Sequence, residues 1–184
     1  MRHKPVTRKT GITVLTAVFL MTFAATSFAM KKEEGKRAIV LASFGTSYPS
    51  ALVAITSIEK EVQRAFNGVK VKTAFTSEII RKIWHERQNN TKFLDENKGI
   101  PKEIFYVKGP LATIADLQDE GYSTIIVQPT HVYEGEEYTD LSSCVDGLNS
   151  IKTVKAEFAP FDKLVLGRPL FGKKGQAYDY HQDL

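Results

Sequence analysis

An imidazole and three carboxylates fall within a seven-residue stretch of this chain. His131 is followed by Glu134, Glu136 and Glu137, and all four stand directly behind the short apolar run 124–127. A β-branched run too short for a helix predicts a buried strand of a parallel sheet, and open α/β sheets bind ligands at the carboxyl ends of their strands. We therefore expect these side chains on the rim of a sheet, where they could bind a divalent cation or transfer protons.

The same residue types also have a structural explanation. Acidic side chains are favoured at the start of a helix by its dipole, and Glu136, Glu137 and Asp140 stand where a helix is predicted to begin. His131 could equally cap that helix or fill the core. Both interpretations stay open at the level of the residues.

From residue 37 onward, short apolar runs alternate with longer amphipathic stretches, a pattern typical of βαβ units. It predicts strands at 38–42, 69–75, 124–127 and 164–166, and helices at 50–66, 77–89, 111–120 and 139–158. The expected fold is α/β, a four-stranded parallel sheet flanked by helices, equivalent to one three-layer half of flavodoxin or Rossmann type. The polar segment 91–101 has no periodicity and is interpreted as a surface insertion. A sheet edge left bare should be covered by more chain or by another subunit.

Three strand-to-helix loops, 43–49, 75–78 and 129–138, should gather on one rim. In the first loop, Gly45 permits a tight turn, and Ser43, Thr46 and Ser47 offer hydroxyl and backbone N–H groups to an anion. Helix capping is the simpler explanation for that loop taken alone. Neither phosphate-binding glycine spacing is present, so no nucleotide is expected.

Residues 1–29 have the layout of a secretory signal peptide: a basic start, an apolar stretch at 11–23 and the small-x-small sequence Ser27-Phe28-Ala29. We expect cleavage after residue 29, an exported, periplasmic protein, and one α/β domain at 30–184. An uncleaved membrane anchor is the alternative, but threonines weaken the apolar stretch.

Charge and cysteine content exclude some classes of function. The leader carries four of the 25 lysines and arginines and none of the 21 acidic residues, which leaves 21 of each sign. A formally neutral mature chain gives no ground for a nucleic-acid partner. Cys144 is the single cysteine, so no intramolecular disulfide is possible, and it is interpreted as a small buried hydrophobe.

One further histidine stands next to an aromatic side chain. His85 follows Trp84 on a predicted helix, a position from which an imidazole could serve as an axial haem ligand. An ordinary surface histidine is the simpler interpretation. The sequence contains no CxxCH haem-attachment motif.

Three motifs in order resemble one enzyme family. Residues 38–48, residues 74–82 and the pair 128–131 with 135–138 resemble the anaerobic cobalt chelatases, the sirohydrochlorin cobaltochelatases of the class II chelatase group. The resemblance covers residues 37 to about 170. With the leader, it suggests an exported variant of that family.

The resemblance implies ATP-independent insertion of divalent cobalt into the tetrapyrrole sirohydrochlorin, in anaerobic cobalamin synthesis. By the same resemblance, His131 and Glu137 would be catalytic, with Glu137 directed at the metal and Glu136 and His131 beside it. The implied lining of the macrocycle pocket, which would meet the ring's carboxylates, is Ser43, Thr46, Tyr48 and Ser77.

The family's enzymes have a second, similar half with a histidine in a Gly-His-Gly turn, and the matching motifs here belong to the first half. A homo-oligomer in which two copies imitate the two halves is therefore expected. The alternatives are a fragment of a longer protein, a non-catalytic exported module that binds metal, haem or tetrapyrrole, and a polypeptide that does not fold stably.

Overall fold

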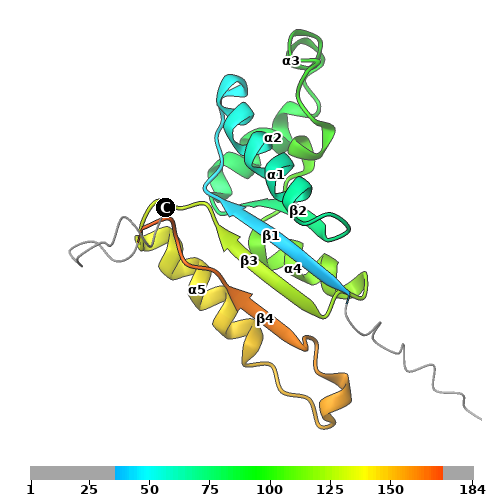
Figure 1. Ribbon diagram of the computed structural model, residues 1–184. Coiled ribbons are helices and arrows are strands. Elements are labelled where there is room, and N and C mark those ends of the chain that lie inside the picture. The colour runs from blue at the N-terminus through cyan, green and yellow to red at the C-terminus, as the bar shows by residue number, and fades with distance from the viewer. Residues whose placement is uncertain (1–35, 172–184) are drawn as a thin grey trace, which may run out of the picture. The chain divides into compact units, whose positions relative to one another are not determined.

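Four parallel strands form a single sheet in the order β2-β1-β3-β4 (Figure 1). The computed structural model describes residues 36–171; the predicted leader lies outside them. The strands are β1 (Arg37–Ser43), β2 (Lys70–Phe75), β3 (Thr124–Pro129) and β4 (Lys163–Leu166). The predicted four-stranded parallel sheet is confirmed.

The register of the strands brings their carboxyl ends to the same edge of the sheet. Ser43 at the end of β1 is level with Phe75 at the end of β2, and Val127 near the end of β3 is level with Leu166 at the end of β4. The loops that leave the strands therefore start along one rim.

Helices cover both faces of the sheet, which makes three layers. The helical elements are η1 (Pro49–Ala51), α1 (Leu52–Ala65), α2 (Glu78–Arg87), α3 (Thr91–Glu96), η2 (Lys102–Tyr106), α4 (Pro110–Asp119), α5 (Glu136–Asn149) and η3 (Ala156–Phe158). On one face, Ile39 and Leu41 of β1 pack near Val62 of α1. On the other, Val40, Ile125 and Val127 form the main core with residues of α4 and α5, including Ile114 and Leu141.

The segment 91–101, interpreted as a surface insertion, has no fully buried residue, but it contains a helix, α3, that the sequence pattern did not predict. Asn90 caps α3, because its side chain accepts a hydrogen bond from the N–H of Phe93 at 3.0 Å. Phe93 then packs edge-on against both Trp84 and Phe105, with ring centroids 6.1 and 6.5 Å away. A six-residue helix is too short to display a hydrophobic period, so the sequence pattern concealed it.

Two predicted helix boundaries are also wrong. The helix predicted at 139–158 spans Glu136–Asn149, because Ser150 ends it by donating its hydroxyl to the carbonyl of Gly147 at 2.7 Å. The helix predicted at 50–66 divides into η1 and α1, and no side chain caps the start of either element. By contrast, the helix predicted at 77–89 does start at Ser77, whose side chain caps α2 by accepting from the N–H of Ile80.

One face of the sheet is only partly covered by helices. Ile126 of β3 is level with Ile39 of β1 and shares its face, yet it is 43% exposed because α1 covers that face only over β1 and β2.

Within residues 36–171, no helix is both long and apolar enough to cross a bilayer. Cys144 on α5 is half-buried rather than fully buried, and burial raises the pKa of its thiol.

Candidate functional site

A hollow of about 730 Å³ opens at the carboxyl edge of the sheet, between the loops that follow β1 and β3. Its lining residues are Ser43, Phe44, Gly45, Ile55, Thr130, His131, Val132, Tyr133, Glu134, Gly135, Glu136, Glu137 and Tyr138. It therefore combines an apolar and aromatic wall with a few polar groups, one imidazole and three carboxylates, as ligand pockets commonly do.

His131 has two buried ring nitrogens, and neither has a hydrogen-bond partner among residues 36–171. Buried polar atoms in proteins normally have such a partner. Burial lowers the pKa of His131, while the negative charge of Glu137 acts in the opposite direction. With a pKa below its usual 6.5, the imidazole is neutral near pH 7, and one ring nitrogen has a lone pair that can accept a proton or bind a cation.

Neighbouring segments hold the backbone on either side of His131. The N–H of Thr130 donates to the carbonyl of Ala42 in β1 at 2.9 Å, and the N–H of Leu170 donates to the carbonyl of His131 at 3.0 Å. The segment 167–171, which follows β4, thus runs beside the loop. Because this support comes from a stretch with no recognisable motif, sequence reasoning missed it.

The carboxylates of Glu136 and Glu137 are exposed in the first turn of α5, and Gly135 precedes them as the N-cap residue. The helix dipole favours acids at this end, so the structural explanation of these residues is satisfied as well. A Cβ at Gly135 would lie 3.1 Å from the ring of Tyr133, which shows how closely the loop folds on itself. The same turn therefore brings negative charge to the edge of the hollow.

Ser43 and Glu136 join His131 and Glu137 around the hollow, so it unites four of the seven predicted site residues. Ser43 is only 2% exposed, and its hydroxyl shares a 2.8 Å hydrogen bond with that of Thr130. Its position is that of a support under the hollow, not of a group projecting into it.

The other three predicted residues, Thr46, Tyr48 and Ser77, are absent from the lining. Ser77 uses its hydroxyl to cap α2, and Thr46 accepts the N–H of Tyr48 with its own hydroxyl at 3.1 Å. Tyr48 stands 71% exposed. Its ring is therefore free to contact a ligand that extends beyond the hollow.

Sequence reasoning missed two aromatic side chains in the lining. Phe44 and Tyr133 are 46% and 51% exposed, although large aromatic side chains usually gain from burial. Neither residue type marks a ligand site by itself, and only their positions directly after a strand and beside His131 would have drawn attention to them.

The described residues contain no group of three or more histidine, cysteine or acidic side chains placed to hold a metal ion. His131, Glu136 and Glu137 therefore do not form a complete metal site by themselves.

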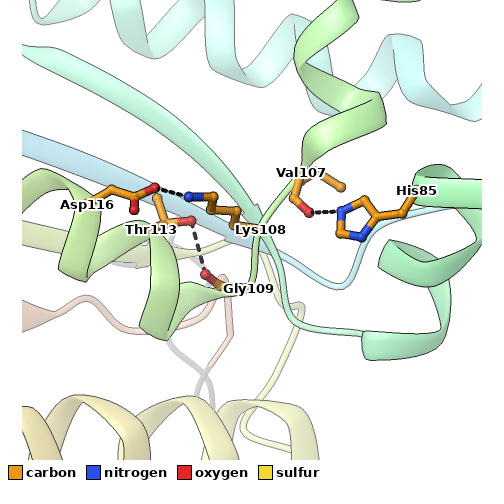
Figure 2. Close-up of polar contacts among 6 residues, drawn as sticks. All are labelled: His85, Val107, Lys108, Gly109, Thr113 and Asp116. Atoms are coloured by element: carbon orange, nitrogen blue, oxygen red, sulfur yellow. Dashed lines mark hydrogen bonds and ion pairs between the residues drawn. The ribbon is translucent and has the colours of Figure 1, made fainter. Parts of the chain in front are cut away.

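A second hollow, of about 710 Å³, lies at the outer edge of β2, away from the strand ends. Figure 2 shows part of its wall, where Lys108 forms an ion pair with Asp116 at 2.6 Å. In the same view, Nε2 of His85 lies 2.9 Å from the carbonyl of Val107. That contact links α2 to the segment after η2, occupies one of the two ring nitrogens of His85 and accounts for this residue without any ligand.

Fold and site together define a three-layer parallel α/β protein with an imidazole and carboxylates at one rim hollow. Comparison with known families gives the same answer as the motifs. The profile of the cobalt chelatases (CbiK) matches residues 37–184, and the chain belongs to this family.

A curated relative is similar over part of the chain. It is the sirohydrochlorin cobaltochelatase CbiKC of Nitratidesulfovibrio vulgaris, strain Hildenborough, which is 26% identical over 113 residues. The matched region is 61% of this chain and 34% of the relative, so the chain spans about a third of that protein's length.

Proposed function

We propose that this chain binds a tetrapyrrole at the rim hollow and serves in the insertion of divalent cobalt into it, as a sirohydrochlorin cobaltochelatase. The observation that carries the proposal is the neutral, unpartnered imidazole of His131 beside the carboxylate of Glu137, in a member of the cobalt chelatase family. A structural histidine would have used at least one of its ring nitrogens.

The chemistry assigns a role to each group. Insertion releases two protons from the pyrrolic nitrogens while the metal exchanges its water for the four ring nitrogens. The neutral imidazole of His131 accepts one of these protons, the second passes to water, and the carboxylate of Glu137 attracts the hydrated cation to the hollow. Because the macrocycle supplies four ligands, a complete protein metal site is unnecessary.

The lining supports a flat organic substrate. Phe44, Val132 and Tyr133 give exposed apolar surface against which a ring can pack. Both ring nitrogens of His131 are covered by neighbouring atoms, so in this proposal the loop 131–138 shifts when the macrocycle enters. Tyr48, Thr46 and Ser77 lie on the same rim and would meet the carboxylates at the periphery of the ring.

The test is a metallation assay on the mature chain. Purified protein is mixed with sirohydrochlorin and Co²⁺, and the absorbance change on metallation is followed against a protein-free control. We expect an accelerated rate that falls at least tenfold in Glu137→Gln. Asp140→Asn is the matched control, since it removes one exposed acid from the same helix outside the hollow. Equal rates in both variants would refute the role of Glu137.

A second candidate function is a non-catalytic exported module that binds metal, haem or tetrapyrrole. The exposed aromatic side chains of Phe44 and Tyr133 in the hollow favour it, because they can bind a flat ring without any proton transfer. This alternative predicts stoichiometric binding of sirohydrochlorin, haem or Co²⁺ in calorimetry with no turnover in the metallation assay. Turnover of several equivalents per chain would exclude it.

Export and self-association are also proposals. Periplasmic location rests on the leader-like residues 1–29, and it predicts a mature protein that starts at residue 30 in a periplasmic extract. A homo-oligomer is supported by the partly exposed Ile126 in the interior of the sheet, because parallel sheets are normally covered on both faces. Light scattering on the mature chain would give the mass, and a monomer would contradict this second proposal.

A further inference from the structure

The loop that joins β1 to η1, residues 44–48, carries an exposed aromatic side chain at each end. Phe44 lines the hollow, and Tyr48 stands beyond it. Between them, Gly45 has a φ of +93°, and a Cβ at this position would lie 2.7 Å from the ring of Phe75. The loop therefore rests directly on the buried end of β2, with no space for a side chain between them.

Two side chains of helix α2 donate hydrogen bonds to the middle of this loop. The Nε1–H of Trp84 donates to the carbonyl of Thr46 at 2.7 Å, and Nη1 of Arg87 donates to the carbonyl of Ser47 at 2.6 Å. The two donors are three residues apart, so they leave the same side of the helix. Two consecutive carbonyls of the loop are thus fixed by one helical turn located about 40 residues further along the chain.

Arg87 contacts two aromatic rings. Its guanidinium carbon lies 4.6 Å from the centroid of Trp84 and 4.6 Å from that of Phe93 on α3, and the planes of these two rings are 70° apart. Contact with both rings restricts a side chain that otherwise samples many rotamers, so less freedom remains to be lost on bonding the loop. Phe93 of α3 thus supports Arg87, and we call Trp84 and Arg87 together the clamp.

We infer that Trp84 and Arg87 are positioning residues that hold the loop 44–48 in the shape that presents Phe44 and Tyr48 to the plane of the tetrapyrrole. The inference rests on the proposed function and extends it to residues that never touch the substrate. A loop already ordered before binding loses less conformational entropy when the ring docks. The clamp therefore acts on affinity for the macrocycle and not on proton transfer.

The test measures binding of metal-free sirohydrochlorin. Trp84 is the only tryptophan of the chain, so quenching of its fluorescence reports the binding of sirohydrochlorin near the loop 44–48. For Trp84→Phe, which keeps a ring but loses the donor, the absorbance of the macrocycle is followed instead. We expect Arg87→Gln and Trp84→Phe to weaken binding about tenfold. In the metallation assay, KM for sirohydrochlorin should rise by the same factor while kcat stays near the wild-type value.

Two controls separate positioning from general loss of stability. Phe105→Leu disturbs the same aromatic cluster without removing a bond to the loop, and Lys82→Gln removes an exposed charge from α2. Both should bind sirohydrochlorin as the wild type does at a temperature where all variants are folded. In Arg87→Ala, millimolar guanidinium should restore affinity, whereas sodium chloride at the same concentration should not.

The outcomes are distinguishable. Unchanged affinity in Arg87→Gln and Trp84→Phe would overturn this inference alone, and so would an equal loss of affinity in Phe105→Leu. A wild-type chain that binds no sirohydrochlorin would overturn the proposed function together with the clamp. Weaker binding in the two clamp variants, unaltered binding in the controls and rescue by guanidinium would establish it.

Discussion

His85 and His131, the two histidines of the described region, are both half-buried, yet their imidazoles have opposite surroundings. Nε2 of His85 is bonded to the carbonyl of Val107, next to the hollow on the edge of β2. Both nitrogens of His131 are buried without a partner, next to the hollow on the rim. Their comparison teaches that hydrogen-bond partners, not exposure or neighbouring aromatic residues, distinguish a structural histidine from one kept available for chemistry.

The largest expected effect comes from substituting each of the two histidines in turn. His131→Ala should lower the metallation rate about 100-fold, because the proton acceptor is lost, and should lower the melting temperature less than His85→Gln does, because no hydrogen bond is lost with it. His85→Gln should keep the rate and lower the melting temperature, since the bond to Val107 is disturbed. Calorimetry and the absorbance assay on both variants give the two readouts. The reverse assignment of effects would break the comparison.

The hydroxyl pair under the rim hollow should give the next largest effect. Ser43→Ala removes a buried hydroxyl and leaves that of Thr130 without its 2.8 Å partner, so the free energy of unfolding should fall by about 1–2 kcal/mol. Urea denaturation measures the change. Ser50→Ala, at an exposed serine in η1 that makes no cap, is the matched control and should change stability by less than about 0.5 kcal/mol.

The contribution of His131 to stability should depend on pH. Burial lowers its pKa below the unfolded value of 6.5, so in the window just below that value the unfolded state binds more protons. The stability contributed by the neutral imidazole is complete above pH 6.5 and is lost as the pH falls through the folded pKa. The melting temperature of the wild type should therefore drop more between about pH 7 and pH 5 than that of His131→Gln. An equal drop in the melting temperature of both proteins over this pH range would contradict this prediction.

The smallest effect is expected at the second hollow. The side chains of Lys108 and Asp116 are each about half exposed, and pairs of this kind contribute at most about 1 kcal/mol. Asp116→Asn should thus change stability slightly and the metallation rate not at all. A loss of rate comparable to that of Glu137→Gln would show that both hollows serve the reaction.

Much of the fold could be predicted because its elements are long enough to display a pattern. β1 and β3 read as apolar runs, and β2 has Val71 between two lysines and ends in Ala74 and Phe75. α1 and α4 read as amphipathic stretches closed by Gly68 and Gly121, whose φ angles are positive. α3 was missed because one and a half turns cannot show a period. The end of α5 was misplaced because its stop depends on Ser150, a residue common in many other contexts.

The candidate site was predicted less completely, for a different reason. His131 and Glu137 are marked by residue type, and their proximity follows from the strand that precedes them. The bonds from Trp84 and Arg87 to the rim loop join residues about 40 positions apart, and no local pattern encodes them. Nor does the isolated sequence reveal that the hydroxyl of Ser43 forms a hydrogen bond with that of Thr130.

The segment behind β4 has a practical consequence for where this domain can be cut. A polypeptide ending at Leu166 would retain every strand of the sheet, and by the usual criterion of intact secondary structure it would count as a complete unit. It would nevertheless lack the amide of Leu170 that binds the carbonyl of His131, and the carbonyl of Gly167 that lies 3.5 Å from the hydroxyl of Tyr138. Expression boundaries for this family are therefore better placed by the support of the histidine loop than by the last strand.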